Sequence, residues 1–200
     1  MHPFCFPSYL CIMKYLICGL GNIGDEYANT RHNIGFIVAD AMAQEAGAAF
    51  KTERYASVTR IRYRGKILVI IKPSTYMNLS GKAVRYWMDA EKITSGNLLV
   101  ITDDIALPTG ILRMRAKGGD GGHNGLESII TTLGTEAFAR LRIGIGNDFA
   151  RGYQSEYVLG KWTREEEEIM IPGIQKAVEM VKSFVARGID LTMTEYNKAE

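Results

Sequence analysis

The sequence predicts a single three-layer α/β domain in which a mixed, mostly parallel central sheet is flanked by helices. Stretches with strand character alternate with stretches of helical periodicity, which is typical of strand–helix–strand units. Residues 66–71 and 97–103 are largely apolar runs, as expected for strands buried on both faces. A turn at Arg64-Gly65 joins residues 54–63 to the first of these runs as a hairpin, so the sheet is expected to be mixed.

In the first half of the chain, the spacing of apolar residues defines each expected element. Tyr15–Cys18 is a short apolar strand, and residues 54–63 alternate between apolar and polar side chains as a half-buried strand does. Helical spacing predicts helices over residues 33–47 and 78–92. Their inward faces are expected to carry Ile34, Ile37, Val38, Ala41 and Met42 in the first helix, and Ala83, Val84, Trp87 and Met88 in the second.

The second half continues the alternation. The expected elements are strands at residues 111–116 and 140–146 and helices at residues 123–133 and 163–188. A glycine-rich loop at residues 117–122 precedes the first of these helices. Thr163 and Glu166 have the spacing of a capping box, which favours a helix start at that point. Pro172 is expected to kink or split the last helix, because proline has no N–H to donate.

Composition and length exclude several classes of protein. With 46% hydrophobic and 23% charged residues, the 200-residue chain has globular composition. Three cysteines, all within the first 18 residues, form neither a disulfide framework nor a metal-binding spacing. No apolar run reaches the ~18 residues that a membrane span needs. These observations predict a soluble, cytoplasmic protein.

Charge is distributed unevenly along the chain. Residues 51–92 hold ten Lys and Arg against three Asp and Glu, whereas residues 151–200 hold seven against nine. This asymmetry predicts one basic face, although a merely solvated surface is an equal alternative.

The first twelve residues differ from the rest. Residues 1–12 contain no Lys or Arg, and two prolines interrupt their apolar residues, so they make a poor signal peptide. We expect them to be a leader that is not native or has no fixed structure. Met13 is then the physiological start, and residues 13–200 form the single domain.

Gly19–Gly24 reads G-x-G-x-x-G directly after a strand, which is the pattern of dinucleotide-binding folds. In those folds a helix begins within the motif and faces the pyrophosphate. Here residues 25–33 are polar, lack apolar periodicity and place two acids where the phosphate belongs. We therefore expect this loop to bring Asn22 and His32 to the carboxyl ends of the strands, where open α/β sheets bind ligands.

His32 is the strongest catalytic candidate, because histidine is the natural general base near neutral pH. It needs a carboxylate to orient it, and Asp103 follows a buried strand with Asp104 next to it. The residues alone do not decide which aspartate reaches the histidine. A structural histidine and an acidic turn or helix cap are the alternative interpretations.

Three asparagines, Asn22, Asn78 and Asn124, occur at strand-to-helix junctions. An amide donates and accepts at once, so a group of amides can bind peptide groups without charge. Helix capping is the alternative for each of them. No serine lies in a nucleophile elbow, so a hydrolase with these residues is expected to use water.

Five blocks of sequence carry a family resemblance. They are Gly19–Gly24, Tyr27–Gly35, Lys72–Lys82, Gly118–Leu126 and Phe138–Gly146. In this order they resemble the motifs of the bacterial-type peptidyl-tRNA hydrolase family. The resemblance implies a monomeric enzyme without metal or cofactor that cleaves the ester between a peptide and the terminal ribose of tRNA. It also implies that His32 is the general base, that Asp103 orients it, and that Asn22 distinguishes N-blocked from free aminoacyl groups.

The resemblance further implies contacts with the substrate. Positions expected to meet its tRNA or peptidyl end are Tyr27, Tyr76, Asn78 and Asn124, and those expected to meet phosphates are Arg113, Arg115 and Arg142. Three positions depart from the family pattern. Thr102 stands where many relatives have histidine, Ala106 where an acidic residue is common, and Glu127 where Lys or Arg is usual. These departures affect the expected tRNA contacts rather than the reaction.

A different class of function is an RNA-binding protein without catalysis. The set of Asn22, His32 and Asp103 discriminates the two, because a binding protein has no need of a base and its orienting carboxylate. A dinucleotide-dependent enzyme is a third and more distant hypothesis.

Overall fold

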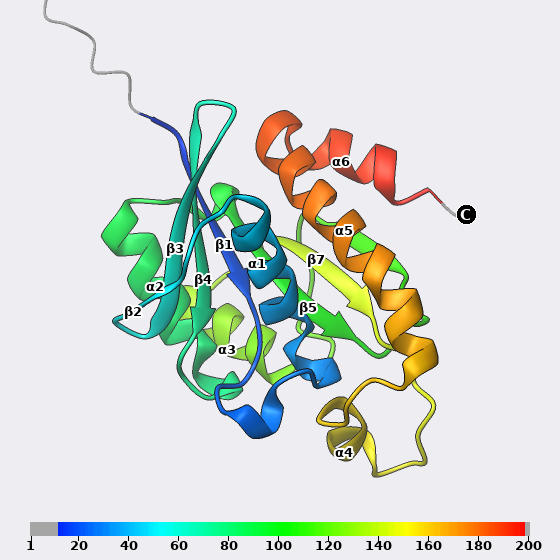
Figure 1. Ribbon diagram of the computed structural model, residues 1–200. Coiled ribbons are helices and arrows are strands. Elements are labelled where there is room, and N and C mark those ends of the chain that lie inside the picture. Colours follow the sequence, from blue (N-terminus) through cyan, green and yellow to red (C-terminus); the bar gives the residue numbers. More distant parts are fainter. Residues whose placement is uncertain (1–11, 199–200) are drawn as a thin grey trace, which may run out of the picture.

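A seven-stranded sheet lies at the centre of the computed structural model, which describes residues 12–198 (Figure 1). The strands in chain order are β1 (Lys14–Gly19), β2 (Lys51–Glu53), β3 (Ala56–Tyr63), β4 (Lys66–Pro73), β5 (Leu98–Asp104), β6 (Leu112–Arg115) and β7 (Ala139–Gly144). In the sheet their order is β2-β3-β4-β1-β5-β7-β6. The four strands β4, β1, β5 and β7 run parallel to one another, whereas β3 is antiparallel to both β2 and β4, and β6 is antiparallel to β7. The expected mixed sheet and its hairpin are confirmed.

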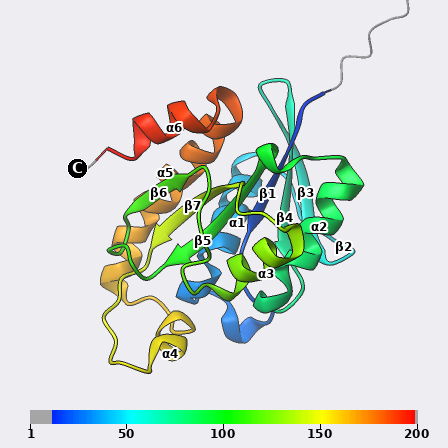
Figure 2. The ribbon, with the colours of Figure 1, turned by 180° about the vertical axis from the view of Figure 1, so that it is seen from behind.

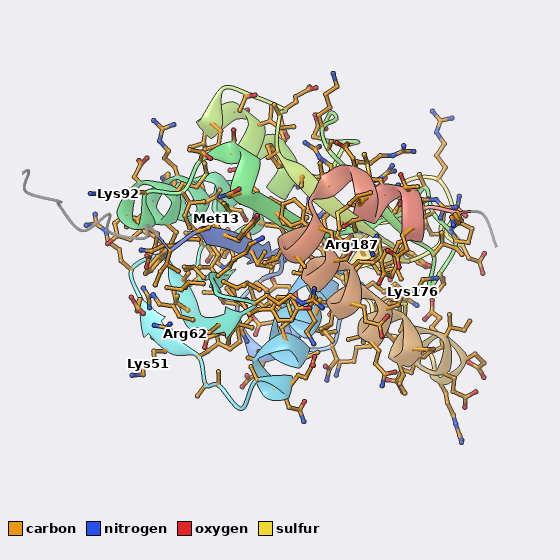
Figure 3. The ribbon with its side chains drawn as sticks, turned by 90° about the horizontal axis from the view of Figure 1, so that it is seen from above. Met13, Lys51, Arg62, Lys92, Lys176 and Arg187 are labelled. Carbon is orange, nitrogen blue, oxygen red and sulfur yellow. The ribbon has the colours of Figure 1, made fainter. Side chains whose placement is uncertain are left out.

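Helices cover both faces of this sheet. One face carries α1 (Ile34–Glu45), α5 (Arg164–Arg187) and α6 (Ile189–Tyr196), and the other carries α2 (Ser80–Glu91) and α3 (Asn124–Leu133). The first group is in front in Figure 1, the second is in front in Figure 2, and Figure 3 shows the layers from above. None of the helices within residues 12–198 combines the length and hydropathy of a membrane span.

Strand β1 shows how the sequence builds two cores. Tyr15 and Ile17 pack into the cluster on the α1 and α5 side, and Leu16 and Cys18 pack into the cluster on the α2 and α3 side. Successive side chains of a strand point to opposite faces, so a strand covered on both sides reads as a continuous apolar run. This explains why the buried strands were recognisable from the sequence.

Helix α5 differs from expectation at Pro172. The capping box between Thr163 and Glu166 is present as predicted, but the helix runs unbroken through the proline, so of the expected kink or split the split is wrong. Pro172 and Glu168, whose carbonyl loses its helical hydrogen bond, are both exposed. Water can solvate that carbonyl, which removes the main reason for the helix to break.

Several short elements were not expected from the sequence. They are β2, α6 and α4 (Gln154–Val158), together with 3₁₀ turns such as Asp25–Tyr27 and Arg31–Asn33. The expected leader falls outside the described residues except for Ile12, and Met13 lies directly before β1.

Two glycines determine how the loop after β1 returns to the sheet. A Cβ atom on Gly19 would lie 2.2 Å from the carbonyl oxygen of Gly35, and one on Gly35 would lie 2.3 Å from the amide nitrogen of Leu20. Only glycine permits this close approach of the end of β1 to the first turn of α1. Because α1 begins at Ile34, ten residues after Gly24, the glycine motif does not open a helix as a dinucleotide site requires.

Candidate active site

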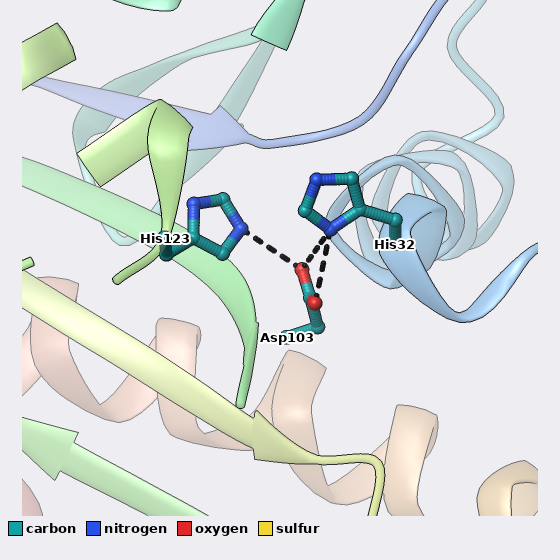
Figure 4. Close-up of side chains that lie close together, drawn as sticks. All are labelled: His32, Asp103 and His123. Carbon is teal, nitrogen blue, oxygen red and sulfur yellow. Dashed lines mark hydrogen bonds and ion pairs between the residues drawn. The ribbon is translucent and has the colours of Figure 1, made fainter. Parts of the chain in front are cut away.

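His32 and Asp103 meet at the carboxyl end of the sheet. His32 lies in the 3₁₀ turn Arg31–Asn33, and Asp103 is the penultimate residue of β5. Nδ1 of the histidine lies 3.0 Å from each carboxylate oxygen of Asp103 (Figure 4). The two side chains are 11% and 3% exposed. The fold therefore brings together two residues that are 71 positions apart in the chain.

Asp104 does not share this role. One of its carboxylate oxygens accepts a hydrogen bond from Nε of Arg142, and the other accepts one from the backbone N–H of Ala106. The structure thus decides the alternative that the sequence left open: Asp103 is the aspartate that contacts His32.

A second histidine binds the same carboxylate. Nε2 of His123 lies 3.0 Å from Oδ1 of Asp103. His123 also caps helix α3, where its Nδ1 accepts hydrogen bonds from the backbone N–H groups of Gly125 and Leu126 at 3.1 and 3.3 Å. Sequence reasoning missed this residue. The signal was its place between the glycine loop and Asn124, in one of the blocks that carry the family resemblance.

The hydrogen bonds assign the protons of both imidazoles. Because Nδ1 of His123 accepts two N–H groups, its proton is on Nε2 and points to Asp103. Burial by itself would raise the pKa of Asp103, but the two imidazoles hold the pKa of this carboxyl well below its usual range. The ionised carboxylate accepts the Nδ1–H of His32, which leaves the lone pair of His32 on Nε2. This is the tautomer that a general base needs.

The same three side chains lie close enough together to be a candidate metal site. One ligand atom from each of His32, Asp103 and His123 lies within 4.8 Å of the others. A neutral imidazole that binds a metal through Nε2 carries its proton on Nδ1. On His123 that proton would face the two N–H groups that now donate to Nδ1. The three side chains therefore suit a hydrogen-bond network, in which both histidines donate to Asp103, better than a metal ion.

Asn22 is held beside this group by a second asparagine. The side chain of Asn33 accepts from the backbone N–H of Asn22 at 2.8 Å and donates to its carbonyl at 3.0 Å. The side-chain oxygen of Asn22 accepts from the N–H of Met77, at the start of the turn Met77–Leu79. Asn22 therefore binds the first N–H of this turn from a distant part of the chain, whereas the N-cap residues are Tyr76 for the turn that contains Asn78 and His123 for the helix that contains Asn124.

A cleft of about 630 Å³ opens over the histidines. Its walls include the glycine loop before α3 and the short helix α4. Four basic residues line it: Arg115, Lys117, Arg140 and Arg142. Arg140 is almost fully buried and donates to the carbonyls of Gly119 and Glu136, so it holds the loop in place. The other three basic residues are at least partly exposed on the rim.

The expected site residues divide among four places. His32, Asp103, Asn124, Arg115 and Arg142 line the main cleft. Asn22 lines a second pocket of about 300 Å³, and Tyr27 is half-buried in the turn Asp25–Tyr27, which follows Asn22 in the chain. Tyr76 and Asn78 are exposed at the turn Met77–Leu79, which Asn22 contacts, with Tyr76 72% exposed. Arg113 instead lines a smaller pocket beside α5 and α6.

Cys18 offers no nucleophile for the cleft. It is fully buried in β1, and burial raises the pKa of its thiol. A water molecule is the nucleophile that fits a cleft with a histidine base.

Comparisons with known proteins agree with this geometry. The family model described as "Peptidyl-tRNA hydrolase" matches residues 16–200. The chain is 54% identical to the peptidyl-tRNA hydrolase of Phocaeicola vulgatus, over 93% of this chain and 100% of that one. It is 52% identical to that of Cytophaga hutchinsonii, over 92% and 98% of the two chains. The crystal structure of peptidyl-tRNA hydrolase from Acinetobacter baumannii superposes with a TM-score of 0.87 at 34% identity, covering 93% of this chain and 95% of that one.

Proposed function

Because this chain belongs to the peptidyl-tRNA hydrolase family, we propose that it hydrolyses the ester bond between an N-blocked peptide and the 3′-terminal ribose of tRNA. The observation that carries the proposal is the contact of His32 with the buried carboxylate of Asp103 inside a cleft with basic residues on its rim. No cofactor enters the proposed reaction, which uses water as the second substrate.

In the proposed mechanism, His32 acts as a general base. Its Nε2 takes a proton from water while the water oxygen attacks the ester carbonyl carbon. Asp103 stabilises the imidazolium that forms, because its carboxylate already accepts the Nδ1–H. As the C–O bond to the ribose breaks, the imidazolium returns its proton to the leaving 3′ oxygen. General-base catalysis of this kind contributes roughly 10²–10⁴-fold to the rate.

The uncharged amides account for selectivity in this proposal. Asn124 lines the cleft. Asn22 is hydrogen-bonded to Asn33, which follows His32 in the chain. Amides in these places bond the peptide group of an N-blocked residue. A free α-ammonium group would lose its water without replacing those bonds, which is how buried polar groups reject a near-isosteric substrate.

Basic and aromatic side chains supply the affinity for tRNA. In this proposal Arg115 and Arg142, which line the same cleft as the proposed base, bind phosphates, and Arg113 extends the contact along β6. Phosphate contacts of this kind are independent of sequence and weaken with salt. Tyr76 is exposed enough to stack on an unpaired acceptor-end base, and Tyr27 is the less exposed aromatic near Asn22.

We further propose that the enzyme acts as a monomer in the cytoplasm. A single chain supplies all the residues of the proposed mechanism, and released peptidyl-tRNA arises where translation takes place.

The direct test is the release of N-acetyl-aminoacyl groups from tRNA by the purified protein. We expect release by the wild type and loss of most turnover in His32→Ala, with retained folding and tRNA binding. Wild-type protein that binds tRNA but releases nothing over buffer would contradict the proposed function and favour the RNA-binding alternative. Near-normal turnover in His32→Ala would instead contradict only the assignment of the base.

A further inference from the structure

We propose that Asp104 is a positioning residue that orients Arg142 toward the substrate's phosphate. The inference rests on the proposed function, and it divides the two adjacent aspartates at the end of β5. Asp103 serves the histidines, and Asp104 serves the phosphate-binding rim of the cleft.

The contacts of Asp104 fix both of its oxygens. Oδ1 accepts from the N–H of Ala106 at 2.8 Å, which ties the carboxylate to the turn after β5. Oδ2 accepts from Nε of Arg142. The side chain of Asp104 is only 15% exposed, so this ion pair is partly shielded from water and salt.

The choice of Nε matters for what Arg142 can still bind. Within residues 12–198, its side chain makes this one ion pair, and neither terminal nitrogen is used in a hydrogen bond. A guanidinium has five N–H donors in a planar fork. Anchoring it through Nε leaves four donors on the terminal nitrogens, and these suit a bidentate contact with a phosphate. Arg142 is 28% exposed and lines the same cleft as His32.

The neighbours of Arg142 explain why an anchor is needed. In the register of β6 and β7, Arg113 lies directly opposite Arg142. Like charges in directly opposite positions of a sheet repel each other. Without Asp104, the long side chain of Arg142 would be free to leave the cleft for solvent. The carboxylate therefore lowers the net positive charge of the rim but holds one guanidinium in place.

These two effects have opposite signs, which makes the inference testable. Asp104→Asn removes a negative charge, so charge alone predicts tighter tRNA binding and a lower KM. Positioning predicts the reverse. We expect KM for N-acetyl-aminoacyl-tRNA to rise about two- to tenfold, the scale of ordering one long side chain, with the change falling on KM rather than on kcat.

A matched control separates charge from positioning. Asp120 lines the same cleft, and within residues 12–198 its side chain accepts one hydrogen bond, from the backbone N–H of Gly122, and none from Arg142. Asp120→Asn therefore removes the same charge without freeing Arg142, and its KM is expected to fall or to stay unchanged. A rise in KM equal to that of Asp104→Asn would overturn the inference.

A double-mutant cycle tests whether Asp104 acts through Arg142. Arg142→Gln alone is expected to raise KM, and adding Asp104→Asn to it should raise KM no further. Additive effects of the two substitutions would overturn the inference. If Asp104→Asn lowers Tm, Asp104→Glu carries the test: it keeps the charge and should stay closer to wild-type KM than the Asn variant. The variants are compared with wild-type protein whose release of N-acetyl-aminoacyl groups has been measured first. A wild type that releases nothing therefore contradicts the proposed function, separately from this inference.

Discussion

Nε2 of His123 lies 3.0 Å from Oδ1 of Asp103, so the carboxylate that contacts the proposed base is also held by a second imidazole. That imidazole is oriented by the first turn of α3, because its Nδ1 accepts two backbone N–H groups. The first turn of α3, His123, Asp103 and His32 thus form one connected hydrogen-bond network, whose three side chains are drawn in Figure 4. Changes at His123 should act on catalysis through Asp103.

The first prediction separates the capping role of His123 from its contact with Asp103. His123→Asn keeps a side chain that can cap α3 but is too short to reach the carboxylate. We expect stability close to wild type and a kcat lowered about tenfold, since one charge-assisted hydrogen bond is lost. His123→Ala should lose the same activity and also about 1 kcal/mol of stability. Chemical denaturation and steady-state kinetics of both variants check this, and wild-type kcat in His123→Asn would contradict it.

The second prediction concerns Asp103→Asn. An amide cannot stabilise the imidazolium of His32 as a carboxylate does, so kcat should fall by roughly 10²–10⁴-fold. The pH dependence of kcat should change as well, because the base loses its charged partner. An unchanged rate and pH profile would remove Asp103 from the mechanism.

The third prediction follows from the pKa of Asp103, which is lowered in the folded protein. A group with a lowered folded-state pKa stabilises the protein above its unfolded pKa, about 3.9 for aspartate, and that stabilisation is lost as the pH falls further. The difference in the free energy of unfolding between wild type and Asp103→Asn should therefore be constant near neutral pH and shrink below about pH 4. Urea unfolding over this pH range measures it. A difference that grows on acidification would contradict the assignment.

The fourth prediction concerns Arg31, which joins the turn of His32 to the start of α5. Its guanidinium donates to both carboxylate oxygens of Glu166 at 3.1 and 2.7 Å and lies 4.4 Å from the ring centre of Tyr157. Arg31→Ala leaves a shielded carboxylate unpaired, so it should cost about 3 kcal/mol of stability.

Arg164 provides the matched control for this prediction. It pairs with Glu168 on the same helix at 3.7 Å, but the two side chains are 88% and 71% exposed. Arg164→Ala should hardly change the midpoint of urea unfolding, because exposed pairs contribute little. Equal losses in Arg31→Ala and Arg164→Ala would show that burial of the first pair does not matter.

The fifth prediction tests the close approach at Gly35. The Cβ atom of Gly35→Ala would lie 2.3 Å from the amide nitrogen of Leu20, where only backbone could move aside. Overpacking of this kind costs about 3 kcal/mol or more, and it should also displace the loop that carries His32. In Gly96→Ala, the nearest atom to the new Cβ would be 4.0 Å away, so this control should keep wild-type stability and activity. Wild-type stability in Gly35→Ala would contradict the packing described for β1 and α1.

Much of the fold was determined by the sequence alone, because its signals are local. The buried strands β4 and β5 read as apolar runs, since both of their faces are covered. The capping box of α5 needs only Thr163 and Glu166, three residues apart. The short elements β2, α4 and α6 were missed because each has only three to eight residues and no clear apolar pattern. Their place depends on contacts with distant parts of the chain.

The identity of the site was likewise present in the sequence, but its connections were not. The motif around His32 was one of the blocks that carried the family resemblance, the resemblance implied that Asp103 orients His32, and the structure supplied the contact between them. Adjacent residues such as Asp103 and Asp104 have the same local pattern, so only the family resemblance favoured Asp103, and the structure showed that Asp103 contacts His32 and Asp104 contacts Arg142. His123 joined the site only when the sheet and α3 were packed together. Local propensity decides which elements form, whereas a hydrogen bond between side chains far apart in the chain exists only once tertiary packing has fixed the positions of both.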